Sequence, residues 1–129
     1  MNDFLSSLYK DCSPAQWHEL IPRLWWYRIY TTNIDDVVEN SYQAGGVQQL
    51  VPIIHLHPYP DQDMWFRKVP CIHLHGSVLD FSEGLTFTFE DFAMQTTAVN
   101  PWYQAPVDDM LTKSFMFVGT RIKEVLWPQ

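Results

Sequence analysis

The fold is decided by the stretch YTTNIDDVV at residues 30–38, which follows the apolar aromatic run WWYRIY at 25–30. The run is typical of a buried strand. Asp35 and Asp36 fit the first turn of the helix that follows, because acidic side chains favour the positive end of a helix dipole. Asn33 falls between the two elements. Ligands of open α/β sheets bind at such strand ends, so these residues predict a junction that presents polar groups to a ligand.

Two later stretches repeat this arrangement, VPCIHLHGS at residues 69–77 and FMFVGT at 115–120. Each predicts an apolar strand, at 69–75 and 114–118, that ends in a polar residue beside a glycine. A further apolar stretch at 50–55 predicts another strand. Its Pro52 favours an edge position, because proline cannot donate a hydrogen bond to a neighbouring strand.

Helical patterns fall around these strands. The expected helices lie at about 13–20, 35–43, 88–100 and 107–112, and the glycines at 45 and 46 end the second of them. Strands that alternate with helices imply a parallel sheet covered on both faces. We therefore expect an α/β fold in which a parallel sheet is flanked by helices.

Taken in order, the three junctions resemble the motifs of the sirtuin family. Thr32-Asn33-Ile34-Asp35 looks like its T-x-N-x-D box, His75-Gly76 like its catalytic His-Gly pair, and Gly119-Thr120 like its late Gly-Thr or Gly-Tyr turn. The resemblance covers about residues 27–126. The closer likeness is to the sirtuin-like domains of bacterial antiphage systems, which hydrolyse NAD. Those domains share the wording T-T-N-x-D-x-x-x-E, here at 31–39, and the leucine of His-Leu-His-Gly.

The resemblance implies a substrate and a role for each matching residue. NAD would be the substrate. Cleavage of its nicotinamide–ribose bond creates positive charge on the ribose ring, so a base and an orienting group are needed. Asn33 would orient the ribose or the attacking water, and His75 would act as general base, since histidine titrates near neutral pH. The other matching residues would bind the nicotinamide, ribose or phosphate parts of NAD: Thr32, Asp35, Gly76, Gly119 and Thr120.

Two departures from the sirtuin pattern change the expectation. The chain has only Cys12 and Cys71, both before the His-Gly pair, so the four-cysteine zinc module of deacetylating sirtuins lacks its ligands and no zinc is expected. The Gly-rich turn that receives the cofactor pyrophosphate has no match either, because residues 1–21 contain no glycine. We interpret residues 1–129 as a single sirtuin-like domain that is N-terminally incomplete, with a partial Rossmann-like sheet.

Other interpretations stay open. Asn33 and Asp35 also suit an ordinary turn and helix cap, and His75 suits a hydrogen-bonded histidine at a strand end. The chain could be a catalytically incomplete interaction module of the same fold, whose loop aromatics meet a partner. It could also be a His-rich metal-binding protein, because HLH occurs at 55–57 and again at 73–75, and alternate residues of a strand face the same side.

Composition limits the partners. The formal net charge is −7 and only 8 Lys and Arg residues are spread along the chain, which argues against a nucleic-acid-binding surface. No run approaches the apolar length that spans a membrane, and two cysteines make no disulfide framework, so a cytoplasmic location is expected. From the resemblance to bacterial antiphage proteins, we expect a homo-oligomer or an assembly with other domains or subunits of a defence complex.

Overall fold

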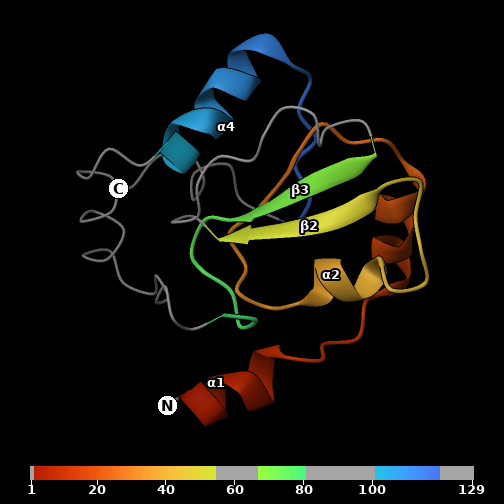
Figure 1. The fold of residues 1–129 in the computed structure, drawn as a ribbon, viewed down its shortest axis with the longest axis vertical. Helices are drawn as coiled ribbons and strands as arrows, with labels where there is room; N and C mark the ends of the chain where they lie inside the picture. The colour runs from red at the N-terminus through yellow and green to blue at the C-terminus, as the bar shows by residue number, and fades with distance from the viewer. Residues whose placement is uncertain (1, 55–66, 81–100, 120–129) are drawn as a thin grey trace.

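The fold is built on a small parallel sheet (Figure 1). The computed structural model describes residues 2–54, 67–80 and 101–119. Its three strands have the order β1-β3-β2, and they are β1 Ile29–Thr31, β2 Gln49–Ile54 and β3 Lys68–His73. Both outer strands pair with β3 in parallel. The predicted α/β fold with a parallel sheet is therefore confirmed, and Pro52 lies in an edge strand as expected.

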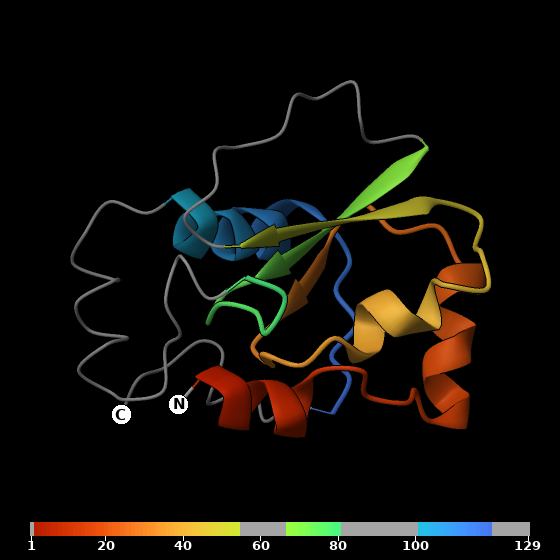
Figure 2. The ribbon, with the colours of Figure 1, turned by 60° about the horizontal axis from the view of Figure 1, so that its bottom comes forward.

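Helices lie on both sides of this sheet, as Figures 1 and 2 show. They are α1 Asn2–Tyr9, the 3-10 helix η1 Gln16–Arg23, α2 Val37–Ser41 and α4 Pro101–Thr112. Ala105 of α4 packs in one core cluster with Ile72 of β3, whereas Glu39 of α2 meets the next residue of β3, His73. Successive residues of a strand point to opposite faces. α4 therefore covers one face of β3 and α2 covers the other.

The apolar core lies between α4 and the sheet. Tyr30, Ile53 and Ile72 sit opposite one another in register, so their side chains share one face. Ile72 is fully buried and Ile53 is 5% exposed. Burial of an isoleucine side chain contributes about 1.5–3 kcal/mol, and this row therefore ties the two outer strands to the central one.

A polar cluster fastens α4 to the first strand. Asp109 accepts hydrogen bonds from the Tyr30 hydroxyl (2.6 Å), from Arg28 Nη1 (3.1 Å) and from Lys113 Nζ (3.0 Å). Burial raises the pKa of the Asp109 carboxyl, but these donors and the two positive charges outweigh that effect, so the pKa lies below its usual value. Asp109 is thus an ionised and fully paired carboxylate that holds α4 against β1.

The segment after α1 is held by the start of α2. Asp36 is 2% exposed, and its carboxylate oxygens accept hydrogen bonds from the backbone N–H groups of Asp11 (2.6 Å) and Cys12 (2.9 Å). The Asn40 side chain donates to the Cys12 carbonyl (2.9 Å). These contacts join residues far apart in the sequence, so the position of α1 depends on α2.

The first strand is shorter than predicted. β1 begins at Ile29 rather than near the start of the run at 25–30, because the Gln48 side chain hydrogen-bonds to the Trp26 backbone in place of a neighbouring strand. Gln48 Oε1 accepts from Trp26 N (2.9 Å), and Gln48 Nε2 donates to Trp26 O (3.0 Å). Trp25 is 58% exposed, so the predicted burial of the aromatic run is wrong at this residue.

The predicted strand at 114–118 is wrong, since these residues have no regular structure. Phe115 stacks on Tyr30 with ring centroids 6.2 Å apart, while Met116 and Val118 are 65% and 49% exposed. An apolar stretch forms a strand only where a partner supplies ladder hydrogen bonds. Within the described residues, the sheet ends at β1 and β2 and provides no such partner.

The later helical limits also differ from the prediction. α4 begins at Pro101, not at residue 107, and contains Pro106. Proline suits the first position of a helix because its missing N–H has no partner there in any case. The prediction treated Pro101 and Pro106 as helix breaks, whereas Pro101 is the first residue of α4 and Pro106 lies within it. The expected helix at 88–100 lies outside the described residues.

The two early helices differ from the prediction as well. The helix expected at 13–20 is a 3-10 helix that starts at Gln16, and Ala15 N, just before it, donates to His18 Nδ1 (2.9 Å). α2 is shorter than the expected 35–43, because Asp36 already holds its N-cap position. The predicted stop after it is confirmed: Gly45 has a φ of 93°, in the left-handed region that glycine favours.

Candidate functional site

The ends of β1 and β3 bring the first two junctions together. The strands pair in parallel with Thr31 opposite His73. Beyond the strands, Leu74 N donates to Thr31 O (3.0 Å) and Val78 N donates to Ile34 O (2.8 Å). The stretches 31–34 and 74–78 therefore run side by side at the carboxyl end of the sheet, which is the edge where α/β folds bind their ligands.

Asn33 is exposed, and its backbone is held by hydrogen bonds from two directions. Its N–H donates to Thr31 Oγ1 (3.1 Å), in the local side-chain turn that threonine forms at strand ends. Its carbonyl oxygen lies 3.3 Å from Nδ1 of His73 and accepts from that ring nitrogen. A fixed backbone under an exposed side chain is the arrangement that a ligand-orienting amide needs.

His75 is half-buried and hydrogen-bonds to the backbone of Thr32, the residue before Asn33. Burial lowers the pKa of the His75 imidazole, and the hydrogen bond to Thr32 opposes this effect only in part. The net direction is downward, so His75 is neutral at pH 7. A neutral imidazole is the form that accepts a proton, as a general base must.

Gly76 makes the turn that places His75. It has a φ of 89°, it is buried, and its N–H donates to His73 O (3.3 Å). Only glycine adopts this backbone conformation without steric cost. The strand expected at 69–75 accordingly ends at His73, and the chain turns before His75 rather than after it.

Asp35 forms a local turn just before the N-cap residue of α2. Its Oδ1 accepts from Val37 N (3.2 Å), the side-chain turn that aspartate commonly makes to the backbone two residues on. Asp35 is only half-buried and lies two residues after Asn33, so its predicted contact with the nicotinamide part of NAD stays a prediction. Thr32 likewise lies beside His75 through its backbone, and its contact with NAD is a prediction.

The third junction is described only in part. Gly119 has a φ of 64°, and a side chain added there would meet nothing within 4 Å. Glycine is therefore favoured at this position by its positive φ, and not by a neighbouring atom that would clash with a side chain. Thr120 lies outside the described residues, and the roles of Gly119 and Thr120 in binding NAD stay predictions.

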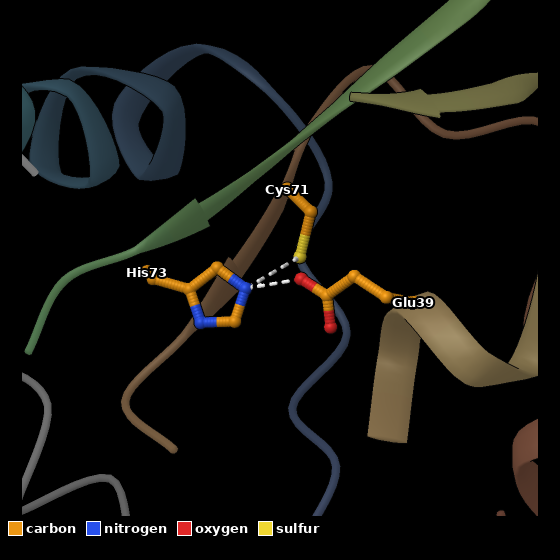
Figure 3. Close-up of side chains that lie close together, drawn as sticks. All are labelled: Glu39, Cys71 and His73. Carbon is orange, nitrogen blue, oxygen red and sulfur yellow. Dashed lines mark hydrogen bonds and ion pairs between the residues drawn. The ribbon is translucent and has the colours of Figure 1, made fainter. Parts of the chain in front are cut away.

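Sequence reasoning missed a buried cluster beneath Asn33, formed by Glu39, Cys71 and His73 (Figure 3). His73 and Cys71 are fully buried, and the Glu39 side chain is 13% exposed. His73 Nε2 forms a hydrogen bond or ion pair with Glu39 Oε1 and lies 4.0 Å from Cys71 Sγ. The signal in the sequence was His73, a polar residue between Ile72 and Leu74 in an apolar strand. A buried polar side chain without a partner is costly, so His73 implied a buried hydrogen-bond partner.

The four-imidazole metal site is not supported by the described residues. His73 meets Glu39, whereas His75 lies in a turn and meets Thr32, so the two rings do not share a strand face. His55 and His57 lie outside the described residues. The side chains of potential ligand type that do converge are Glu39, Cys71 and His73, with ligand atoms within 4.8 Å of one another.

A comparison with family models settles the relationship. The model of the SIR2-like domain matches residues 27–125, which is most of the chain and includes all three junctions. The chain belongs to the SIR2-like domain family. No curated protein sequence matches it. Sirtuin-like domains have NAD-related functions, so the match supports a function of that kind for this domain.

Within this SIR2-like domain, the described structure brings together Thr32, Asn33, His75 and Gly76 at the carboxyl end of β1 and β3. The Glu39–His73 pair lies directly under them and contacts the Asn33 backbone. None of the described helices is both long and apolar enough to span a membrane.

Proposed function

We propose that this SIR2-like domain hydrolyses NAD to nicotinamide and ADP-ribose. The observation that carries the proposal is the pairing of the stretches 31–34 and 74–78, through Leu74 N to Thr31 O (3.0 Å) and Val78 N to Ile34 O (2.8 Å), which brings His75 beside Thr32 and the exposed Asn33. It places a neutral imidazole beside an uncharged amide at the ligand-binding edge of the sheet. The family match supports NAD as the substrate.

The chemistry requires one bond to break and one to form. The bond between the nicotinamide nitrogen and ribose C1′ breaks, and its electron pair leaves with the nicotinamide, which becomes neutral. Water adds to C1′, and its proton passes to Nδ1 or Nε2 of His75. Asn33 orients the ribose hydroxyls or the water through its amide. This orientation matters because the transition state carries positive charge on the ribose, and the water must be aligned with C1′ to attack it.

The other predicted residues complete the binding of NAD in this proposal. Asp35 and Thr32 face the nicotinamide ribose side. Gly76, Gly119 and Thr120 allow or make the contacts to ribose and phosphate. The pyrophosphate turn of a complete Rossmann-like site has no counterpart in residues 1–21, so we propose that a longer protein or a second subunit supplies it.

We also propose a setting in bacterial antiphage defence, in the cytoplasm and in an assembly. Exposed apolar side chains gather on and just after η1, and they are Trp17, Leu20, Leu24 and Trp25. Apolar residues on a protein surface often mark an interface. The same observation favours the second candidate function, a catalytically incomplete interaction module of the same fold.

The test is nicotinamide release from NAD by this chain and by any longer product that contains it, with Asn33→Ala beside Asn2→Ala. Asn2 is an exposed asparagine at the start of α1, away from the sheet. We expect release by the parent and by Asn2→Ala, and loss of about 100-fold or more in Asn33→Ala. Release by the longer product alone would place the missing pyrophosphate turn outside residues 1–129. No release by either would leave the interaction module as the better account.

A further inference from the structure

The Glu39–His73 pair is connected to Asn33 by an unbroken chain of hydrogen bonds. Glu39 Oε1 meets His73 Nε2, and His73 Nδ1 lies 3.3 Å from the Asn33 carbonyl oxygen. The carboxylate comes from α2, the imidazole from β3, and the carbonyl from the turn after β1. One side chain thus joins three separate elements at the point where Asn33 is presented.

The hydrogen bonds fix where the protons lie. A carbonyl oxygen can only accept, so Nδ1 of His73 carries a proton and donates to Asn33. One further proton then lies between Nε2 and Glu39 Oε1, on either atom. In both cases the imidazole is locked in one ring orientation by partners on both nitrogens, in the same way that a second partner orients a metal-bound or catalytic histidine.

The cost of this arrangement argues for a role beyond stability. Glu39 Oε2 is buried and has no hydrogen-bond partner within the described residues, so the carboxylate depends on His73 alone. A buried ion pair rarely stabilises a protein more than apolar residues of the same volume would, because both groups lose their hydration. Such a pair is better explained by the geometry that it imposes on its neighbours.

A metal ion explains the cluster less well. Zinc holds nitrogen and carboxylate ligands at about 2.0–2.2 Å and would keep them about 3.3 Å apart at the tetrahedral angle. Nε2 and Oε1 are instead in direct hydrogen-bonding contact. Burial, with the nearby charges of Glu39 and Asp35, raises the pKa of the Cys71 thiol well above its usual value. Without a metal ion, Cys71 is therefore a protonated, packed thiol.

We propose that Glu39 and His73 are positioning residues, which fix the Asn33 turn by holding its backbone carbonyl from below. The kinetic part of this inference rests on the proposed NAD hydrolysis, while the structural part does not. Removal of the carboxylate should free the His73 ring, loosen the Asn33 turn and slow turnover, with little effect on how tightly NAD binds.

The first test uses magnetic resonance of the chain with isotope-labelled histidine, and needs no NAD. We expect the unchanged protein to show a protected ring proton on Nδ1 of His73 and a second protected proton between Nε2 and Glu39. We expect Glu39→Gln to lose the signal on the Glu39 side and to shift the Asn33 backbone amide. The matched control is Asp109→Asn, which also neutralises a buried carboxylate bonded to the sheet but lies on the other face. It should leave the Asn33 signals in place.

The second test measures steady-state hydrolysis of NAD by the same variants. For Glu39→Gln we expect kcat to fall by about 10- to 100-fold while KM changes by less than about twofold, the signature of a misplaced group rather than a lost binding contact. Asp109→Asn should lower the melting temperature without this fall in kcat. A purely structural role for Glu39 would make the two variants behave alike.

Each outcome decides a different claim. If the unchanged protein shows no turnover, the proposed function fails, and the Asn33 signals of Glu39→Gln still decide the positioning role. If those signals do not move, or if His73 in the unchanged protein lacks protected ring protons, the inference is overturned even when Glu39→Gln fails to fold. One equivalent of metal in the purified chain that disappears in Cys71→Ser would also overturn it, in favour of a metal site.

Discussion

His75→Ala should lower NAD hydrolysis by about 100- to 10,000-fold, the range that removal of a general base costs. The reason is the position of His75 beside Thr32 and Asn33, together with the downward shift of its pKa through burial. The measurement is kcat/KM for NAD in the form of the protein that turns over. The matched control is His18→Ala, which also removes a half-buried ring, one that stacks on Trp17 and accepts from Ala15 N.

The same residue sets the expected pH dependence. The neutral imidazole is the active form, and burial pulls the pKa of His75 below its ordinary value of 6.5. Activity should therefore be constant through pH 7 and fall only as the pH drops below 6.5 and His75 takes up a proton. In the His75→Ala variant this acid limb should vanish from the residual rate. An acid limb centred above pH 7, or equal losses in His75→Ala and His18→Ala, would remove His75 from the reaction.

Asp36→Ala should give the largest loss of stability among single changes near the site. Asp36 is 2% exposed, and its removal leaves the N–H groups of Asp11 and Cys12 without their charged acceptor. Hydrogen bonds to charged groups contribute about 1.5–3 kcal/mol each, so we expect a loss of about 2–4 kcal/mol after partial rehydration of the two donors. Denaturant unfolding measures this loss, and limited proteolysis should show earlier cleavage after α1.

Asp35→Ala is the matched control for that experiment, because it removes the neighbouring carboxylate of the same helix start. Asp35 Oδ1 accepts a local hydrogen bond from Val37 N, and loss of one such hydrogen bond costs about 1 kcal/mol. Equal destabilisation by the two variants would mean that the link between α2 and the segment after α1 does not hold the fold.

The parallel sheet was predictable because its two longer strands are apolar and separated by helical patterns. β2 and β3 lie within one or two residues of their predicted limits. The strand at 114–118 was not excluded by its pattern, since aromatic and β-branched residues suit a strand wherever a partner exists. Whether a partner exists is a tertiary property, and here Phe115 packs on Tyr30 instead.

The early end of the first strand had a different cause. Residues 25–30 have strand-like composition, but Gln48 captures the Trp26 backbone through both of its amide atoms. A glutamine 22 residues away gives no periodic signal. The short β1 could therefore be learned only from the folded arrangement.

The sequence was enough to predict Asn33 and His75 as neighbours in the candidate site, but not the Glu39–His73 pair beneath them. Parallel strands bring their carboxyl ends to one edge, so the order of the motifs was enough to place Asn33 near His75. The pair beneath them needed more, because the side chain of Glu39 reaches His73 only through the orientation of α2 over β3. Cys71 and His73 are two residues apart in one strand and therefore share a face, and this spacing was a usable clue that the sequence analysis did not draw on.

The central claim is that Asn33 and His75 act together in one NAD-hydrolysing site, and a double-mutant cycle tests it most directly. The measurement is kcat/KM for nicotinamide release by the parent, by Asn33→Ala, by His75→Ala and by the double variant. Residues that act as one unit give strongly non-additive losses. We therefore predict that kcat/KM of the double variant lies within about threefold of that of the slower single variant. Losses that multiply would show two independent sites of action and would contradict the account.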